Sequence, residues 1–298
     1  IFVSLIYQYS ILELSCLTLT YLISMKKLLL LSIFTILISC VQKTNRMDEN
    51  NKIIPLEDFF KNPEMQSFKL SPNGEYISYM KPWEEGNRMM NVYVRGVDSE
   101  EEVRITSASD RSLYGYFWLN DNRIAYVQDK GGDENIHIYA VNIDGANNID
   151  LTPFENIQAR VTDDLEDDPN FMLVSINKRN PRIHDVYRLN VNSGDMEMIA
   201  ENPGNISGWM TDNNGKLRIA VTSDGVNTSL LYRKNESDQF SPILTTNFKE
   251  SVSPLYFTFD NESVYVSSNR GRDKSAIFTF NLSTAKEEEL IFEHDEVD

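Results

Sequence analysis

Short apolar runs separated by turn residues recur along most of the chain. In the stretch FKLSPNGEYISYM, residues 68–80, the turn residues SPNG stand between two runs in which apolar and polar positions alternate. Alternation with a period of two predicts strands with one buried face, and Pro, Asn and Gly favour the turn between them. The pattern therefore predicts a β-hairpin at this point.

The same hairpin pattern returns at a steady interval. Each unit predicts a strand, a Pro/Asn/Asp/Gly turn, an alternating strand, a polar loop, a strand with an aromatic residue, a tight turn and a fourth strand. The matching turns lie near residues 72, 121, 168, 213 and 261, a spacing of roughly 45–50 residues. The five units span about residues 68–106, 114–152, 159–199, 207–244 and 255–291. The aromatic residues of the third strands are Tyr93, Tyr139, Tyr187, Tyr232 and Phe278.

Four short antiparallel strands in each unit of about 45 residues are typical of a β-propeller blade. A single such sheet cannot bury both of its faces, so neighbouring sheets must stack, with the third-strand aromatics between them. We therefore predict an all-β protein with about five four-stranded propeller blades, forming an incomplete ring. A β-sandwich is the alternative fold, and the regular period disfavours it.

The first part of the chain is markedly apolar. The stretch MKKLLLLSIFTILISC, residues 25–40, has a basic start and an apolar run of 11 residues, shorter than the roughly 20 residues of a membrane span. Its end, LISC, looks like a bacterial lipobox that finishes at Cys40. We predict a lipoprotein signal peptide over residues 25–39, acylation of Cys40, a tether over residues 40–54 and the propeller over residues 55–298.

Residues 1–24 are interpreted as upstream translation that is not part of the native protein. The protein is expected in the bacterial cell envelope, attached to the membrane by its lipid. An ordinary signal peptide, an N-terminal membrane helix and a membrane hairpin over residues 1–40 remain alternatives.

Composition excludes some classes of function. The formal net charge is −17, which argues against a nucleic-acid partner because phosphate binding needs clustered Lys and Arg. The two cysteines are Cys16 and Cys40, so no disulfide or thiolate site is expected in the polar body of the chain.

No motif for a cofactor or metal stands out, and none is predicted. The histidines His137, His184 and His294 fall in different units and are interpreted as ordinary strand or loop residues. The stretch TDDLEDDPN, residues 162–170, offers carboxylates for calcium, but it lacks the central glycine and final glutamate of an EF-hand loop. A solvated turn is the favoured interpretation there, as it is for the basic stretch SNRGRDK, residues 268–274.

Several stretches taken in order resemble the prolyl oligopeptidase family of serine peptidases. They are IPLEDFFKNPEMQSFKLSPNGEYISYM at residues 54–80, MNVYVR at residues 90–95 and DDPNFMLVS at residues 167–175. The resemblance is to the bacterial dipeptidyl- and acylaminoacyl-peptidase-like branch. It implies an N-terminal propeller that admits short or unfolded peptides to a C-terminal α/β-hydrolase domain with a Ser-Asp-His triad.

The chain departs from that family in one respect. A nucleophile elbow requires Gly-x-Ser-x-Gly, but the two glycines four apart, Gly204 and Gly208, have Ile206 between them. We therefore expect no catalytic residue here, and the hydrolase domain becomes a missing partner. Glu84 and Glu85 are weak candidates for binding the amino terminus of a peptide, by analogy with the paired glutamates of some dipeptidyl peptidases. The alternative function is a stand-alone propeller lipoprotein that acts as a binding scaffold, similar to TolB.

Overall fold

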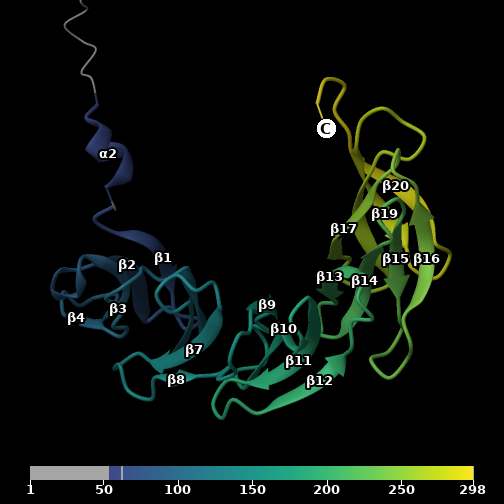
Figure 1. Ribbon diagram of the computed structural model, residues 1–298. Helices are drawn as coiled ribbons and strands as arrows, with labels where there is room; N and C mark the ends of the chain where they lie inside the picture. The colour runs from purple at the N-terminus through teal and green to yellow at the C-terminus, as the bar shows by residue number, and fades with distance from the viewer. Residues whose placement is uncertain (1–53, 62, 298) are drawn as a thin grey trace, which may run out of the picture. The chain divides into compact units, whose positions relative to one another are not determined.

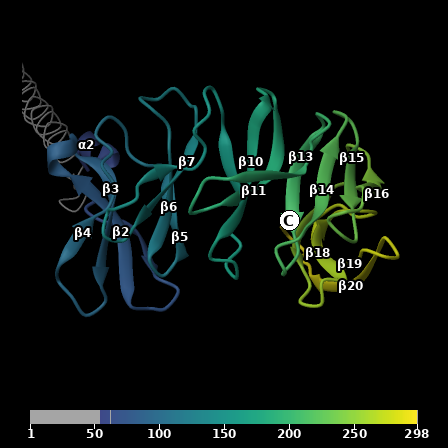
Figure 2. The same ribbon diagram turned by 90° about the horizontal axis from the view of Figure 1, so that it is seen from below.

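A computed structural model of the protein describes residues 54–61 and 63–297 (Figures 1 and 2). The chain divides into two compact units, residues 1–61 and 62–298. In the first unit, the described part holds the short helix α2 (Leu56–Phe60), whose Leu56, Phe59 and Phe60 are exposed. The predicted signal peptide, Cys40 and nearly all of the tether lie outside the described residues. No helix in the described ranges is both long enough and apolar enough to cross a membrane.

The second unit contains five four-stranded antiparallel sheets, here called blades 1 to 5. Blade 1 consists of β1 (Gln66–Leu70), β2 (Tyr76–Trp83), β3 (Met89–Gly96) and β4 (Glu102–Arg104). Blade 2 consists of β5 (Gly115–Asn120), β6 (Arg123–Gln128), β7 (His137–Asn142) and β8 (Ile149–Asp150). Blade 3 consists of β9 (Ala159–Asp163), β10 (Phe171–Asn180), β11 (Ile183–Asn190) and β12 (Met196–Ala200). Blade 4 consists of β13 (Ile206–Thr211), β14 (Leu217–Ser223), β15 (Thr228–Tyr232) and β16 (Ser241–Thr246). Blade 5 consists of β17 (Val252–Phe257), β18 (Ser263–Ser268), β19 (Ala276–Asn281) and β20 (Lys286–Phe292).

The predicted hairpin and its repeats are confirmed. In blade 1 the Ser71 carbonyl accepts the Gly74 N–H at 2.9 Å, and Gly74 has a φ of +73°, which glycine adopts without strain. The Ser71 hydroxyl also accepts the Tyr76 N–H at 2.9 Å, so the turn closes with its backbone groups paired. Every blade is a simple up-and-down meander, as the strand orders show, and this confirms the all-β propeller-type fold.

Successive blades bury hydrophobic residues between their faces, and each such contact is called a joint below. The joint between blades 1 and 2 contains eleven buried hydrophobic residues, and the joint between blades 2 and 3 contains twelve. The joint between blades 4 and 5 contains eight, whereas the joint between blades 3 and 4 contains five. Apolar burial is the main favourable term in folding, so stacking along the chain stabilises the blades unevenly.

Hydrogen bonds join the first-turn regions of adjacent blades at all four joints, and at the joint between blades 3 and 4 the Thr211 hydroxyl donates to Asp163. The Asn73 N–H donates to Asp121 at 2.9 Å, and the Asn120 side chain donates to the Pro169 carbonyl at 3.3 Å. The Asn213 N–H donates to the Asn261 side chain at 2.9 Å. These partners are 48 or 49 residues apart, which matches the sequence repeat.

Four of the five third-strand aromatics lie between blades, as predicted, although one of the four faces a different joint from the others. Tyr139, Tyr187 and Phe278 pack in the joint with the preceding blade. Tyr232 instead packs in the joint with the following blade, so its neighbour Leu231 points to the face toward the preceding blade, because side chains alternate along a strand. Tyr93 in blade 1 stacks on Tyr79 of its own blade, with ring centroids 6.3 Å apart.

Candidate functional site

A large cavity lies at the joint between blades 3 and 4. It has a volume of about 750 Å³ and is called the joint pocket below. Its walls are the loop of residues 163–168, the turn of residues 210–216, Arg188 on β11 and residues 255–257 on β17. Three blades therefore contribute to one concave surface.

The blade 3 wall of the joint pocket is a loop folded by its own carboxylates. Asp163 accepts the Leu165 N–H at 2.8 Å, and Asp168 accepts the Asn170 N–H at 3.1 Å. Leu165 adopts a φ of 52° and is only 8% exposed. Its side chain packs so closely on Gly215 that a Cβ added to Gly215 would lie 2.5 Å from the Leu165 Cδ2. The Thr211 hydroxyl donates to Asp163 and so connects this wall to blade 4.

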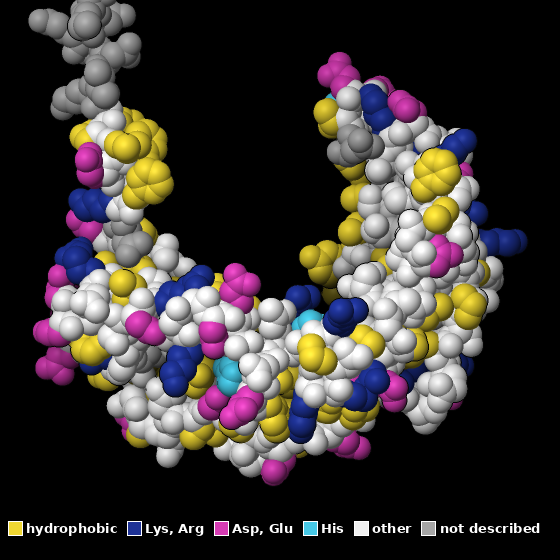
Figure 3. All heavy atoms as spheres, in the orientation of Figure 1, with side chains coloured by type: hydrophobic (Ala, Val, Ile, Leu, Met, Phe, Trp, Pro, Cys, Tyr) yellow, Lys and Arg dark blue, Asp and Glu magenta, His cyan; other side chains and the backbone are white. Residues whose placement is uncertain are grey.

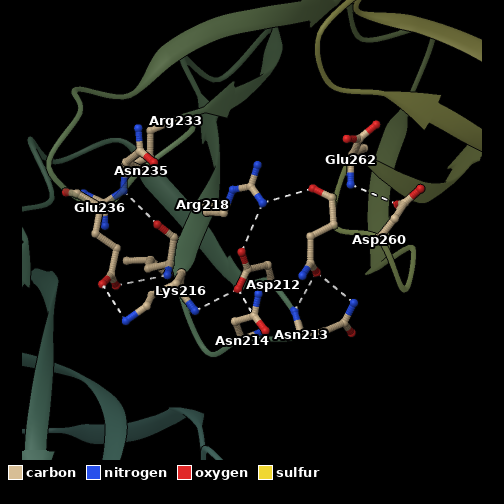
Figure 4. A network of polar contacts seen from close by, with 12 residues as sticks. Asp212, Asn213, Asn214, Lys216, Arg218, Arg233, Asn235, Glu236, Asp260 and Glu262 are labelled. Carbon is tan, nitrogen blue, oxygen red and sulfur yellow. Dashed lines mark hydrogen bonds and ion pairs between the residues drawn. The ribbon is translucent and has the colours of Figure 1, made fainter.

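The blade 4 wall is held by a buried ion pair (Figure 4). Arg218 Nη1 lies 3.0 Å from Asp212 Oδ2 and 3.0 Å from the Asn261 carbonyl oxygen of blade 5. The other oxygen of Asp212 accepts the N–H groups of Asn214 and Lys216, each at 3.0 Å. The turn is thus fixed by a carboxylate whose oxygens are all in use.

The joint pocket has a negative balance of charge. Among the described residues, no basic side chain forms an ion pair with Asp164, Glu166 or Asp167. The two basic side chains at its edge, Arg188 and Lys216, are both directed to Glu236, at 3.5 and 3.7 Å.

Clefts lined by charge of one sign raise the local concentration of ligands of opposite charge. An aromatic contact is also available, because Tyr256 is 76% exposed beside the cavity. The joint pocket is therefore suited to a cationic ligand with an apolar part.

The predicted candidates Glu84 and Glu85 lie elsewhere. They form a 3₁₀ turn, Glu84–Gly86, in the connection from β2 to β3, and both are exposed. The Arg88 guanidinium donates to the Glu84 carboxylate at 2.6 Å. The Trp83 ring covers Gly86 so closely that a Cβ added to Gly86 would lie 2.0 Å from a ring carbon of Trp83. In a four-stranded meander the connections from strand one to two and from strand two to three lie at opposite ends. The structure therefore does not bring these glutamates together with the joint pocket.

The three histidines occupy separate surroundings. His137 Nδ1 lies 2.7 Å from Asp150 Oδ2, in a second pocket of about 480 Å³. His294 is exposed and accepts the Glu296 N–H at 3.1 Å. The Nε2 atom of His184 is buried and has no hydrogen-bond partner among the described residues. Within residues 54–61 and 63–297, no three His, Asp or Glu side chains are arranged to hold a metal ion.

Sequence reasoning missed the joint pocket, although it had singled out the acidic stretch of residues 162–170 as a turn. The connection from β9 to β10, residues 164–170, has seven residues, against five in blades 1, 4 and 5 and two in blade 2. That added length was the available signal, since a long connection at one repeat position indicates a feature that the other units lack.

Comparisons with known proteins were made on this fold and site. No protein-family model matches the chain. It is 29% identical over 245 residues to dipeptidyl aminopeptidase BIII of Pseudoxanthomonas mexicana, covering 79% of this chain and 34% of the relative. It is 24% identical over 260 residues to dipeptidyl peptidase family member 6 of Caenorhabditis elegans, covering 80% of this chain and 34% of the relative. The chain thus spans about a third of the length of these curated relatives.

Solved structures share the arrangement of sheets. Dipeptidyl peptidase 4 of Porphyromonas gingivalis matches with a TM-score of 0.54 at 12% identity, over 76% of this chain and 39% of that one. An oligogalacturonate lyase in complex with manganese matches with a TM-score of 0.52 at 12% identity, over 76% of this chain and 68% of that one. At such identities the likeness concerns the fold.

The fold therefore defines a β-propeller of the kind found in peptidases. The sequence matches go further, because they place the chain among homologues of the dipeptidyl aminopeptidases. This confirms the resemblance to the propeller region of prolyl oligopeptidase family peptidases that the repeat and its lead predicted.

Proposed function

We propose that this chain is the substrate-gating propeller of a lipid-anchored serine peptidase of the prolyl oligopeptidase family. The observation that carries the proposal is the 29% identity to dipeptidyl aminopeptidase BIII over 245 residues. Its catalytic partner is an α/β-hydrolase domain, and its substrates are short peptides. The chain itself contains no Gly-x-Ser-x-Gly elbow, so it supplies no activated serine.

The decisive test is to read the coding sequence that follows the codon of Asp298. An open frame encoding Gly-x-Ser-x-Gly within strand–helix alternation is the expected result, because the triad serine must lie at such an elbow. The purified chain alone should not hydrolyse dipeptidyl or acyl-peptide chromogenic substrates. A stop codon followed by an unrelated gene would contradict the proposal.

The lipid anchor is tested separately at Cys40. Several acyl chains at one cysteine hold a soluble domain firmly, at about 0.8 kcal/mol for each buried methylene. Cys40→Ala should abolish incorporation of labelled palmitate and move the protein from the membrane fraction to the soluble fraction. Thr44→Ala, in the tether just after Cys40, is the control and should change neither result. Unchanged labelling in Cys40→Ala would refute lipidation at this residue.

Peptide binding is proposed for the exposed turn of residues 84–86. Two carboxylates can hold a peptide ammonium group, but Glu84 is already paired with Arg88, which leaves Glu85 as the stronger candidate. Glu85→Gln should weaken binding of a free-amino dipeptide by about tenfold and leave binding of its N-acetylated form unchanged. Glu100→Gln, another exposed glutamate of blade 1, is the control. Equal losses for both peptides would assign Glu85 another role.

A stand-alone binding propeller is the second candidate function. The observation that favours it is the joint pocket, which has a ligand-sized volume and needs no hydrolase domain to be complete. Calorimetric titration with lysine-containing tripeptides, repeated at higher salt, would detect binding at this pocket. Loss of that binding in Asp164→Asn would support the pocket as the site, and retention would exclude it.

A further inference from the structure

The joint between blades 3 and 4 differs from the other three joints in its contacts. Its buried core consists of five hydrophobic residues, namely Leu165, Leu173, Val186, Ala200 and Leu217. The Thr211 hydroxyl of blade 4 donates to Asp163 of blade 3, and Arg188 lies 3.5 Å from Glu236, but the joint pocket separates much of the two blades here. This joint is therefore the one that a small change in free energy is most able to open.

His184 lies in this joint, toward the end opposite to the joint pocket. It precedes Val186 by two positions on β11, so both side chains point to the face that packs on blade 4. The neighbouring Ile183 packs on the connection from β12 to blade 4, where a Cβ on Gly204 would lie 3.5 Å from the Ile183 Cδ1. Because the Nε2 atom of His184 is buried without a partner, it can carry a proton there only as an unpaired donor.

The charged groups around His184 disfavour its imidazolium form. Burial and the Arg160 charge on β9 lower the pKa of His184, while Asp185 on its own strand acts in the opposite direction. Asp185 is fully buried and its two oxygens are taken by Arg179 of β10, at 2.8 and 2.9 Å, so it is not available to pair with the histidine. Glu201, after β12, is directed to the same Arg179 at 3.5 Å.

Blade 4 offers no compensating carboxylate at this position. The connection that leads into blade 4, residues 202–206, reads NPGNI and carries no charge. Asp224, which follows β14, accepts the N–H groups of Val226 and Asn227 at 2.9 and 2.7 Å within its own turn. Every element packed near the ring therefore presents a cation, a carboxylate already in use, or no charge.

We propose that His184 makes the joint between blades 3 and 4 acid-sensitive, so that protonation of its buried Nε2 opens this joint while the other joints stay closed. In the opened joint the imidazole is hydrated and titrates near its ordinary value of about 6.5. If only the neutral ring fits the closed joint, the equilibrium constant for opening of the joint increases about tenfold when the pH falls from 7.5 to 5.5. Opening would separate the two main walls of the joint pocket, so acid would also weaken a ligand held there.

The test is hydrogen exchange followed by mass spectrometry on the whole chain at pH 7.5 and pH 5.5. Rates are corrected with an unstructured peptide of the same sequence, because exchange itself depends on pH. In the wild type, protection of peptides covering β11 and β13 should fall about tenfold more than protection of peptides covering β2 and β3. His184→Gln should remove this local response, and His294→Gln, at an exposed histidine, should keep it.

A second variant keeps the test decisive if His184→Gln does not fold. Arg160→Gln changes an exposed residue and removes the cation that disfavours the charged ring, so the acid response at β11 and β13 should become smaller. A response that persists undiminished in either variant would overturn the proposal. So would an acid response spread equally over all five blades, since that describes general unfolding.

Discussion

Blade 3 is held on its two sides in different ways. Against blade 2 it buries part of a twelve-residue hydrophobic core, and the Arg123 side chain of blade 2 donates to the Val191 carbonyl of blade 3 at 3.1 Å. Against blade 4 it shares five buried hydrophobic residues, a cavity of about 750 Å³ and a histidine nitrogen without a partner. The same repeat unit thus forms a tightly packed joint and a loosely packed one.

The difference follows from which residues occupy equivalent positions. The joint with blade 2 receives large aliphatic side chains from both blades, including Ile138, Met172 and Leu189, all fully buried. At the joint with blade 4, the acidic loop of residues 163–168 lines a cavity, and of this loop only Leu165 belongs to the buried core. A repeat architecture therefore fixes where joints form but leaves their strength to a few side chains.

The largest effect is expected where a buried charge loses its partner. Asp212→Ala removes the carboxylate that pairs with Arg218, a residue that is only 9% exposed and whose Nε has no hydrogen-bond partner among the described residues. Because the guanidinium charge is then buried without a counter-charge, the free energy of unfolding should fall by about 4 kcal/mol. Asp260→Ala removes the corresponding turn carboxylate of blade 5, which is exposed, and should lower the free energy of unfolding far less. Urea unfolding measures both. Equal losses would show that the ion pair does not stabilise the wall of the joint pocket.

Two leucines compare the joints of blade 3 directly. Leu189→Ala empties space in the twelve-residue core and should cost about 3 kcal/mol. Leu165→Ala borders the joint pocket, which is open to water, so it should cost only about 1 kcal/mol. Both losses are measured from the midpoints of denaturant unfolding, provided that the slope of the free energy of unfolding against denaturant concentration is the same in all proteins. If Leu165→Ala costs as much as Leu189→Ala, the joint with blade 4 is as tightly packed as the joint with blade 2.

Alkaline pH should act on the opposite end of the blade series. Burial raises the pKa of Tyr116, in the joint between blades 1 and 2, to about 12. A tyrosine with a raised pKa contributes stability that is present below its unfolded value near 10 and is lost as pH rises toward 12. Ionisation of Tyr116 in the unfolded state should therefore lower the free energy of unfolding of the wild type by about 1.4 kcal/mol at pH 11. Between pH 9 and pH 11 the free energy of unfolding of Tyr116→Phe should fall by about 1.4 kcal/mol less than that of the wild type. Unfolding curves at both pH values that are identical in the two proteins would contradict this assignment.

The smallest effect concerns the hydrogen bonds between first turns. The Asn213 side chain donates to the Thr258 carbonyl and to the Asn261 side chain, each at 2.8 Å, across the joint between blades 4 and 5. Asn213→Ala should cost about 0.5–1 kcal/mol, because these bonds are exposed. Asn214→Ala, in the same turn but directed away from blade 5, should cost less in a thermal melt. A larger loss for Asn214→Ala would show that these bonds do not contribute.

Most of the fold could be predicted from the sequence because it depends on local patterns. Alternation and turn residues placed the hairpin around residues 71–74, and the corresponding turns fall between the first two strands of every blade. The third-strand aromatics of blades 2, 3 and 5 were correctly placed between blades. In blade 4 the pattern could not distinguish Leu231 from Tyr232, since both are apolar and their facing depends on the register with β14.

The candidate site was less accessible from the sequence. Glu84 and Glu85 were noticed as an acidic pair, but the pairing of Glu84 with Arg88 depends on the 3₁₀ turn that places the two side chains together. The joint pocket was not predicted, because a cavity forms where three blades fail to fill space between them. No local pattern records such a failure of packing.

By itself the sequence determined the repeat, the meander within each blade and the excess of acidic residues, since these depend on side-chain period, turn preference and composition. Only the tertiary structure decided which joint is weak, that Asp212 and Arg218 form a buried pair, and that the His184 Nε2 atom has no hydrogen-bond partner in the described part of the chain. The physical reason is that burial and pairing depend on the faces of two sheets brought together, and the residues on those faces are tens of positions apart along the chain.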